Sequence, residues 1–112
     1  MKVNKETGRH YVWGGDCDGW HLLETESLSV IEERIPPGGG EVLHWHGKAQ
    51  QLFYILSGEA TFESDGLEAL VAGGEAYHVR PGVRHRIRNL GTGDLRFLVI
   101  SEPKSHGDRV NV

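Results

Sequence analysis

The side chains best suited to chemistry lie in two short stretches of the chain. The first stretch, GGGEVLHWHGKAQQLFYILSG, spans residues 38–58 and holds His44 and His46 two positions apart in apolar surroundings. Successive side chains of a strand point to opposite faces, so these two imidazoles share a face, roughly 6 to 7 Å apart. Imidazole is the commonest metal ligand among side chains, because it is neutral near pH 7 and offers a free lone pair. The spacing predicts that both rings bind one metal ion.

Two more ligands are expected from neighbouring strands. If the turn after His46 returns the chain as the partner strand, Gln51 begins that strand. The second stretch, VRPGVRHRIRN, carries a Pro-Gly turn followed by His85. Three imidazoles and one amide leave coordination positions open for water or a ligand. We therefore predict a metal site made of His44, His46, Gln51 and His85.

The donor types limit the ion without naming it. Imidazole nitrogens and one oxygen suit zinc, iron, nickel, manganese or copper. An amide oxygen is a neutral donor, so the full charge of one divalent transition metal ion remains on the site and favours an anionic ligand. Because histidine must be neutral to bind a metal, the affinity should fall below about pH 6 to 6.5.

At these residues the sequence resembles the cupin family. The first cupin motif, G-x5-H-x-H-x(3,4)-E-x6-G, is matched by Gly38, His44, His46, Gln51 and Gly58, with Gln51 where glutamate is usual. The second motif, G-x5-P-x-G-x2-H-x3-N, is matched by Gly74, Gly82, His85 and Asn89, with Arg80 at the proline position. The resemblance implies one cupin barrel over residues 1–112, with motif 1 at 38–58, motif 2 at 74–89, and terminal arms at 1–9 and 102–112.

Composition and patterning independently favour an all-β fold. Sixteen glycines suit many tight turns, and no segment shows helical apolar periodicity beyond about two turns. Asp65-Gly66, between two apolar runs, predicts a hairpin. Further strands are expected at 10–13, 20–23, 28–35, 59–63, 67–71, 75–80 and 95–101. Together with the resemblance, this predicts a double-stranded β-helix, the jelly-roll barrel of cupins.

The interior of the barrel should hold a small-molecule cavity with an apolar wall. We expect Phe53, Ile55, Tyr77, Val79 and Ile87 to line it. The remaining candidates are assigned elsewhere: His10, His21 and His78 to the surface or core, and Glu33 and Arg34 to a solvated pair on the outer face.

The C-terminal segment is expected to be a solvated arm or a dimer contact. The alternative is that it folds over the barrel mouth, where His106, Asp108 and Arg109 could bind an anion or act as acid and base. Small barrels leave exposed edge strands, so a homodimer is expected, with the aromatic N-terminal segment covering an edge of the partner.

Several classes of protein are disfavoured. The net charge of −4 offers no basic stripe for nucleic acid. No apolar run reaches the roughly 18 residues of a membrane span, and the N-terminus lacks the apolar core of a signal peptide, so a cytoplasmic protein is expected. Cys17 is the single cysteine, which excludes an internal disulfide, and its neighbours Asp16 and Asp18 should raise the thiol pKa.

Three functions fit these observations. The first is a small metalloenzyme that acts on a small organic molecule in the cavity, by dioxygenase or Lewis-acid chemistry. The second is a non-catalytic module that binds or senses a small molecule. The third is an isomerase or polyketide-cyclase-like enzyme, in which His106 or Glu33 serves as the base. The resemblance to cupins implies the first without choosing the reaction.

Overall fold

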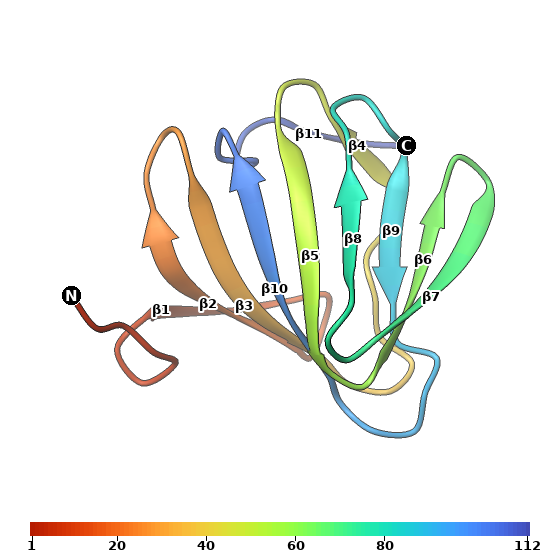
Figure 1. Ribbon diagram of the computed structural model, residues 1–112, viewed down its shortest axis with the longest axis horizontal. Coiled ribbons are helices and arrows are strands. Elements are labelled where there is room, and N and C mark those ends of the chain that lie inside the picture. Colours follow the sequence, from red (N-terminus) through yellow and green to blue (C-terminus); the bar gives the residue numbers. More distant parts are fainter.

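The fold is all-β, as predicted. The computed structural model describes all 112 residues. Their strands form two antiparallel sheets, and there is no helix. Consequently no helix is long and apolar enough to span a bilayer. One sheet has the strand order β1-β2-β3-β10-β5-β8 and the other β11-β4-β9-β6-β7 (Figure 1). The strands are β1 (Arg9–Trp13), β2 (Cys17–Glu24), β3 (Ser29–Ile35), β4 (His44–His46), β5 (Gln50–Ser57), β6 (Glu59–Ser64), β7 (Leu67–Ala72), β8 (Ala76–Val79), β9 (His85–Arg88), β10 (Leu95–Glu102) and β11 (Arg109–Asn111).

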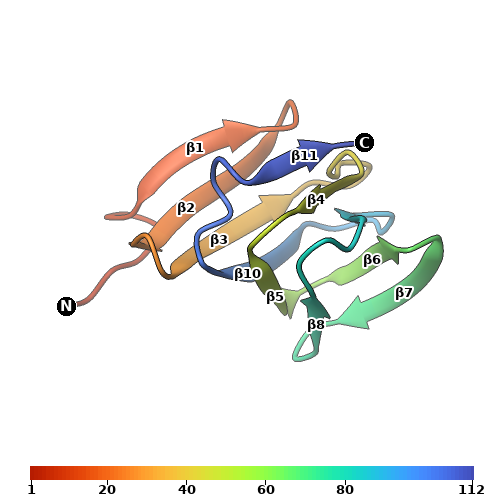
Figure 2. The same cartoon turned by 90° about the horizontal axis from the view of Figure 1, so that it is seen from above.

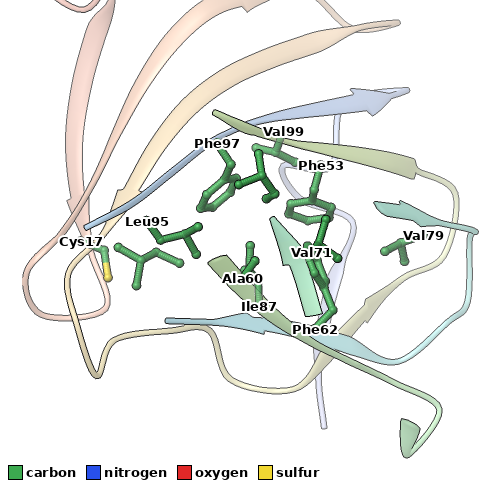
Figure 3. Close-up of a cluster of buried hydrophobic side chains, with 12 residues drawn as sticks. Cys17, Phe53, Ala60, Phe62, Val71, Val79, Ile87, Leu95, Phe97 and Val99 are labelled. Atoms are coloured by element: carbon green, nitrogen blue, oxygen red, sulfur yellow. The ribbon is translucent and has the colours of Figure 1, made fainter. Parts of the chain in front are cut away.

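The core lies between the two sheets, which Figure 2 shows as two layers seen from above. The core is formed by the alternation of buried and exposed side chains along β5 and β10. Between these two strands Phe97 pairs with Ile55, and Val99 pairs with Phe53. Twelve buried residues form one apolar cluster, to which β6 adds Phe62 (Figure 3). Burial of each large side chain contributes about 1.5–3 kcal/mol, so this cluster holds the sheets face to face.

The hairpin predicted at Asp65-Gly66 is present. It joins β6 to β7, and both residues have positive φ, 49° and 79°, as a type I′ turn requires. Gly58, the last residue of the first motif, also has a positive φ of 86°, and a Cβ there would lie 2.8 Å from the carbonyl oxygen of Asp94. Glycine is therefore required at this turn for conformation and for space.

The expected pairing of β4 with β5 is wrong. The short strand β4 pairs with β9 and β11 in one sheet, whereas β5 pairs with β10 and β8 in the other. The turn between them crosses from sheet to sheet, and the Asp108 carboxylate accepts its three successive N–H groups, from Gly47 (3.2 Å), Lys48 (2.9 Å) and Ala49 (2.9 Å). Residues on β4 and β5 consequently face each other across the barrel.

The C-terminal segment is not a solvated arm, because its last residues form β11 beside β4 (Figure 2). Arg109 is in register with His46. At its other end the segment is tied to the β2–β3 turn, where the Lys104 ammonium lies 2.9 Å from the Glu26 carboxylate. The segment therefore bridges two turns, and Lys104, His106 and Arg109 from it line the cavity described below.

Candidate metal centre

Three imidazoles meet between the two sheets. His44 and His85 are cross-strand partners on β4 and β9, and His46 follows two residues after the first. Their exposed fractions are only 1%, 0% and 5%. One ring nitrogen from each lies within 4.8 Å of the other two, a spacing that one metal ion could bridge. The structure thus brings together the three histidines that the sequence singled out, on adjacent strands of one sheet.

Backbone carbonyls fix the orientation of two of these rings. Nδ1 of His44 lies 2.8 Å from the carbonyl oxygen of Val42, and Nδ1 of His85 lies 2.9 Å from that of Val83. A carbonyl only accepts hydrogen bonds, so each Nδ1 carries the proton and each Nε2 keeps its lone pair. This is the tautomer that binds a metal through Nε2.

Gln51 approaches the same point from the opposite sheet. Its amide nitrogen donates to the hydroxyl of Ser101, its partner on β10, at 3.0 Å. Its carbonyl oxygen then lies 3.2 Å from Nε2 of His85. An oxygen and a nitrogen lone pair that face each other at this distance form the arrangement expected of two ligands of one cation.

The unpaired ring nitrogens of His46 indicate whether the site fits a cation. Neither of its ring nitrogens has a hydrogen-bond partner, although both are buried. Burying such a group unpaired costs about 1–3 kcal/mol, which a bond to a metal ion would offset. Burial lowers the pKa of His44 to about 3 and that of His46 to about 4, and it also lowers the pKa of His85. The rings are therefore neutral at pH 7, and the donor set fits a divalent transition metal.

A carboxylate that the sequence reasoning missed lies beside the imidazoles. Oε2 of Glu41 is 3.8 Å from Nε2 of His44 and 3.8 Å from Nη1 of Arg109, while Oε1 accepts the N–H of Ile87 at 3.3 Å. Burial raises the pKa of Glu41 to about 7, against the opposing charge of Arg109. Glu41 lies in the loop before β4, where no strand parity indicates its direction.

A cavity of about 1100 Å³ opens beside the three histidines, and most of the residues that line it are polar or charged. Arg109, Lys104 and His106 from the C-terminal segment line it, as do Tyr11 of β1 and His21 of β2. The cavity therefore lies under the C-terminal segment, between the metal-facing histidines and the strands β1 to β3.

The residues that line the cavity differ from those that we expected. Of the predicted lining residues, Phe53 contributes to the wall. Ile55, Val79 and Ile87 are instead closed into the core, and Tyr77 packs against that core by stacking on Phe62 with 4.3 Å between ring centroids. The half of the barrel around β8 and β9 is filled by aromatic side chains, so the open space lies toward β1 to β3.

Glu33 and His21 also occupy unexpected positions, because both line the cavity. Glu33 shares the strand parity of Ile31 and Ile35, which face inward, whereas Arg34 points outward to the Asp18 carboxylate. The carboxyl of Glu33 accepts a hydrogen bond from the Tyr11 hydroxyl at 2.8 Å, and burial raises its pKa to about 8. The alternating parity along β3 was the signal that could have identified it.

Comparison with known proteins identifies the family to which the chain belongs. The profile of the cupin domain matches residues 31–101, which include all four candidate ligands. The chain belongs to the cupin family. A protein of Thermotoga maritima named oxalate-binding protein is 31% identical over 91 residues, which cover 77% of this chain and 75% of that one.

Solved structures of cupins superpose over most of the chain. The crystal structure of a predicted oxalate decarboxylase from Thermotoga maritima has a TM-score of 0.83 and 26% identity, covering 93% of this chain and all of that one. KdgF from Halomonas sp. has the same TM-score of 0.83 at 17% identity, covering 94% and 95% of the two chains, a likeness of fold alone. The predicted family and the predicted double-stranded β-helix are both confirmed.

Proposed function

We propose that this cupin binds a small carboxylate ligand in the cavity through a divalent transition metal ion held by His44, His46, Gln51 and His85. The convergence of three neutral, buried imidazoles and one amide oxygen carries the proposal. A divalent cation bound there would act as a Lewis acid that accepts a carboxylate oxygen. The name of the Thermotoga maritima relative, oxalate-binding protein, supports this class of ligand.

The charges around the cavity also support an anionic ligand. All four proposed ligands are neutral, so none of them cancels the charge of the ion. In the cavity wall Arg9 pairs with Glu24 and Lys104 pairs with Glu26, whereas the Arg109 guanidinium makes no contact with a carboxylate shorter than the 3.8 Å to Glu41. The carboxylate of Glu41 reaches within 3.8 Å of both His44 and Arg109, so the space between an imidazole and the guanidinium accommodates a carboxylate.

Calorimetric titration tests this proposal. Oxalate, malonate and tartrate are titrated into the protein loaded with manganese or zinc and into the chelator-treated protein, and the metal content is measured by mass spectrometry. We expect binding only with metal, and a loss of about ten- to hundredfold in affinity for Arg109→Gln, because a charge-assisted hydrogen bond contributes about 1.5–3 kcal/mol. Arg86→Gln, at a guanidinium paired with Glu63, is the matched control. Equal affinity after chelation would contradict the proposal.

Acid–base catalysis is a second candidate, favoured by a specific observation. Two carboxyl groups, the buried Glu33 and the partly buried Glu41, have pKa values raised to about 8 and about 7, within the range that suits proton transfer at neutral pH. Turnover of a bound carboxylate would distinguish an enzyme from a binding module. Oxygen consumption with iron, copper or manganese would indicate dioxygenase chemistry, whereas activity with zinc or nickel and no oxygen uptake would indicate a Lewis-acid role.

The homodimer remains part of this proposal. Leu52, Tyr54 and Leu56 alternate along β5 and expose about 40% of their surface on the outer face (38%, 39% and 41%). A row of apolar and aromatic side chains is typical of interface cores. Sedimentation at micromolar concentration checks the dimer, and Tyr54→Glu should shift it toward monomer.

A further inference from the structure

A gap in the side chains of β2 brings a tyrosine to a buried carboxyl group. Tyr11 of β1 pairs with Gly19 of β2, which in turn pairs with Glu33 of β3, so the three residues form one row across the sheet. A Cβ at position 19 would overlap the ring of Tyr11. Because glycine leaves that space open, the ring crosses β2 and its hydroxyl reaches Oε2 of Glu33 at 2.8 Å. A glycine inside a strand commonly marks such a close approach.

The carboxyl group of Glu33 is buried, with 9% exposure, and no cation pairs with it within 4 Å. Tyr11 donates to Oε2, whereas Oε1 has no hydrogen-bond partner in the protein, and Glu33 is one of the residues that line the cavity. An ionised carboxylate in such a place pays a large desolvation cost, so the neutral acid is favoured. Since Oε2 already accepts the tyrosine proton, the acid carries its own proton on Oε1, the oxygen that is left without a partner.

We propose that Glu33, oriented by Tyr11, is a neutral carboxylic acid that donates a hydrogen bond to an anionic oxygen of the bound carboxylate ligand. This inference rests on the proposed function, and it assigns a ligand contact to the part of the cavity wall that β3 forms. Hydrogen bonds from a hydroxyl to a carboxylate are short and strong, so an acid at this position selects anionic oxygen over neutral oxygen. An ionised Glu33 would instead repel the same ligand.

Coupling between ligand and proton follows from this contact. The ligand binds the protonated form of Glu33, so its affinity should be constant at lower pH and fall about tenfold per pH unit once the carboxyl ionises. Burial of Glu33 raises its pKa most, Glu41 from the loop before β4 raises it further, and Tyr11 from β1 and Arg109 from β11 lower it. The Cys17 thiol of β2 lies near enough for Glu33 to raise the Cys17 pKa. On β10 the partner of Glu33 is the apolar Phe97.

Oxalate titration of the metal-loaded protein between pH 7 and 9.5, in two buffers of different ionisation enthalpy, tests the inference. We expect wild type to take up a proton on binding at the alkaline end. Glu33→Gln should take up no proton on binding. Its affinity should not show the alkaline break, which is the pH above which the wild-type affinity begins to fall, since an amide N–H donates at every pH. Tyr11→Phe should move the break to higher pH, because the tyrosine hydroxyl favours the ionised carboxylate and lowers the pKa of Glu33.

Further variants keep the result interpretable. Gly19→Ala displaces the Tyr11 ring without changing either polar group and should act in the same direction as Tyr11→Phe. Glu59→Gln, at an exposed carboxylate that does not line the cavity, is the control and should behave as wild type. Tyr11→Phe also decides the matter if Glu33→Gln fails to fold.

The two proposals fail in different ways. The role of Glu33 is overturned, and the proposed function kept, if oxalate binding depends on metal but shows the same alkaline break in wild type and Glu33→Gln. A break that stays at the same pH in Tyr11→Phe has the same consequence. A metal-loaded wild-type protein that binds no carboxylate at any pH overturns the proposed function together with this inference.

Discussion

Replacement of Glu33 by glutamine should change how the stability of the metal-free protein depends on pH. The pKa of this carboxyl is about 8 in the fold and 4.5 as its ordinary value. Between those limits the unfolded chain has released the proton and the folded chain retains it, so stability falls as pH rises through this window and levels off above about pH 8. At about 1.36 kcal/mol per pH unit, the loss reaches at most about 5 kcal/mol. Glutamine does not titrate and removes this loss.

Urea unfolding of the chelator-treated protein measures the effect. The three tryptophans report unfolding by fluorescence, and linear extrapolation gives the unfolding free energy at each pH from 5 to 9.5. A loss of several kcal/mol is a large part of the 5–15 kcal/mol that stabilises a typical domain, so it is well above the error of the measurement. Wild type should lose stability relative to Glu33→Gln across this range. Parallel curves for the two proteins would show that Glu33 is ionised in the fold and would refute the reasoning.

Three further outcomes are expected. A hundredfold excess of metal over its dissociation constant should stabilise wild type by about 2.7 kcal/mol and leave His44→Ala unchanged, as thermal melts with and without chelator will show. Gly58→Ala should lower the free energy of unfolding by about 1–3 kcal/mol in the same urea assay, and by more than Gly15→Ala does. Both glycines have positive φ (86° and 94°), but only at position 58 would the added Cβ meet backbone, 2.8 Å away. Asp108→Asn should speed amide exchange at residues 47–49 and proteolysis of the C-terminal segment, since the carboxylate accepts all three of those N–H groups.

The residues of the candidate metal site could be predicted because their positions follow from local rules. Two histidines separated by one residue in a strand must share a face, whichever strands lie beside them. The offsets of the cupin motifs then added His85 and Gln51, and the structure brings all four side chains together. The turns were predictable for the same reason, since Asp65-Gly66 needs no distant partner to adopt positive φ.

The cavity wall could not be predicted because it depends on which segments pair. The strand β11 has three residues and no periodicity of its own, and it exists because β4 offers it a free edge. A Glu-Arg pair is typical of a solvated face and favours an outward Glu33, whereas the parity of Ile31 and Ile35 on the same strand favours the inward position that is found. On β3, strand parity therefore predicts the direction of a side chain better than local charge does.

The distribution of these residues along the chain suggests how ligand choice is encoded. The family profile covers residues 31–101 and contains the four candidate metal ligands, whereas Tyr11, His21 and Arg109 lie outside it and line the same cavity. The metal centre needs two facing sheets with fixed registers, which constrains the middle of the chain. The terminal segments only have to pack on free edges, at β3 and β4, so their side chains can vary without disturbing the barrel. Tyr11 and Arg109 are therefore the residues at which a change in the proposed ligand should be tested first.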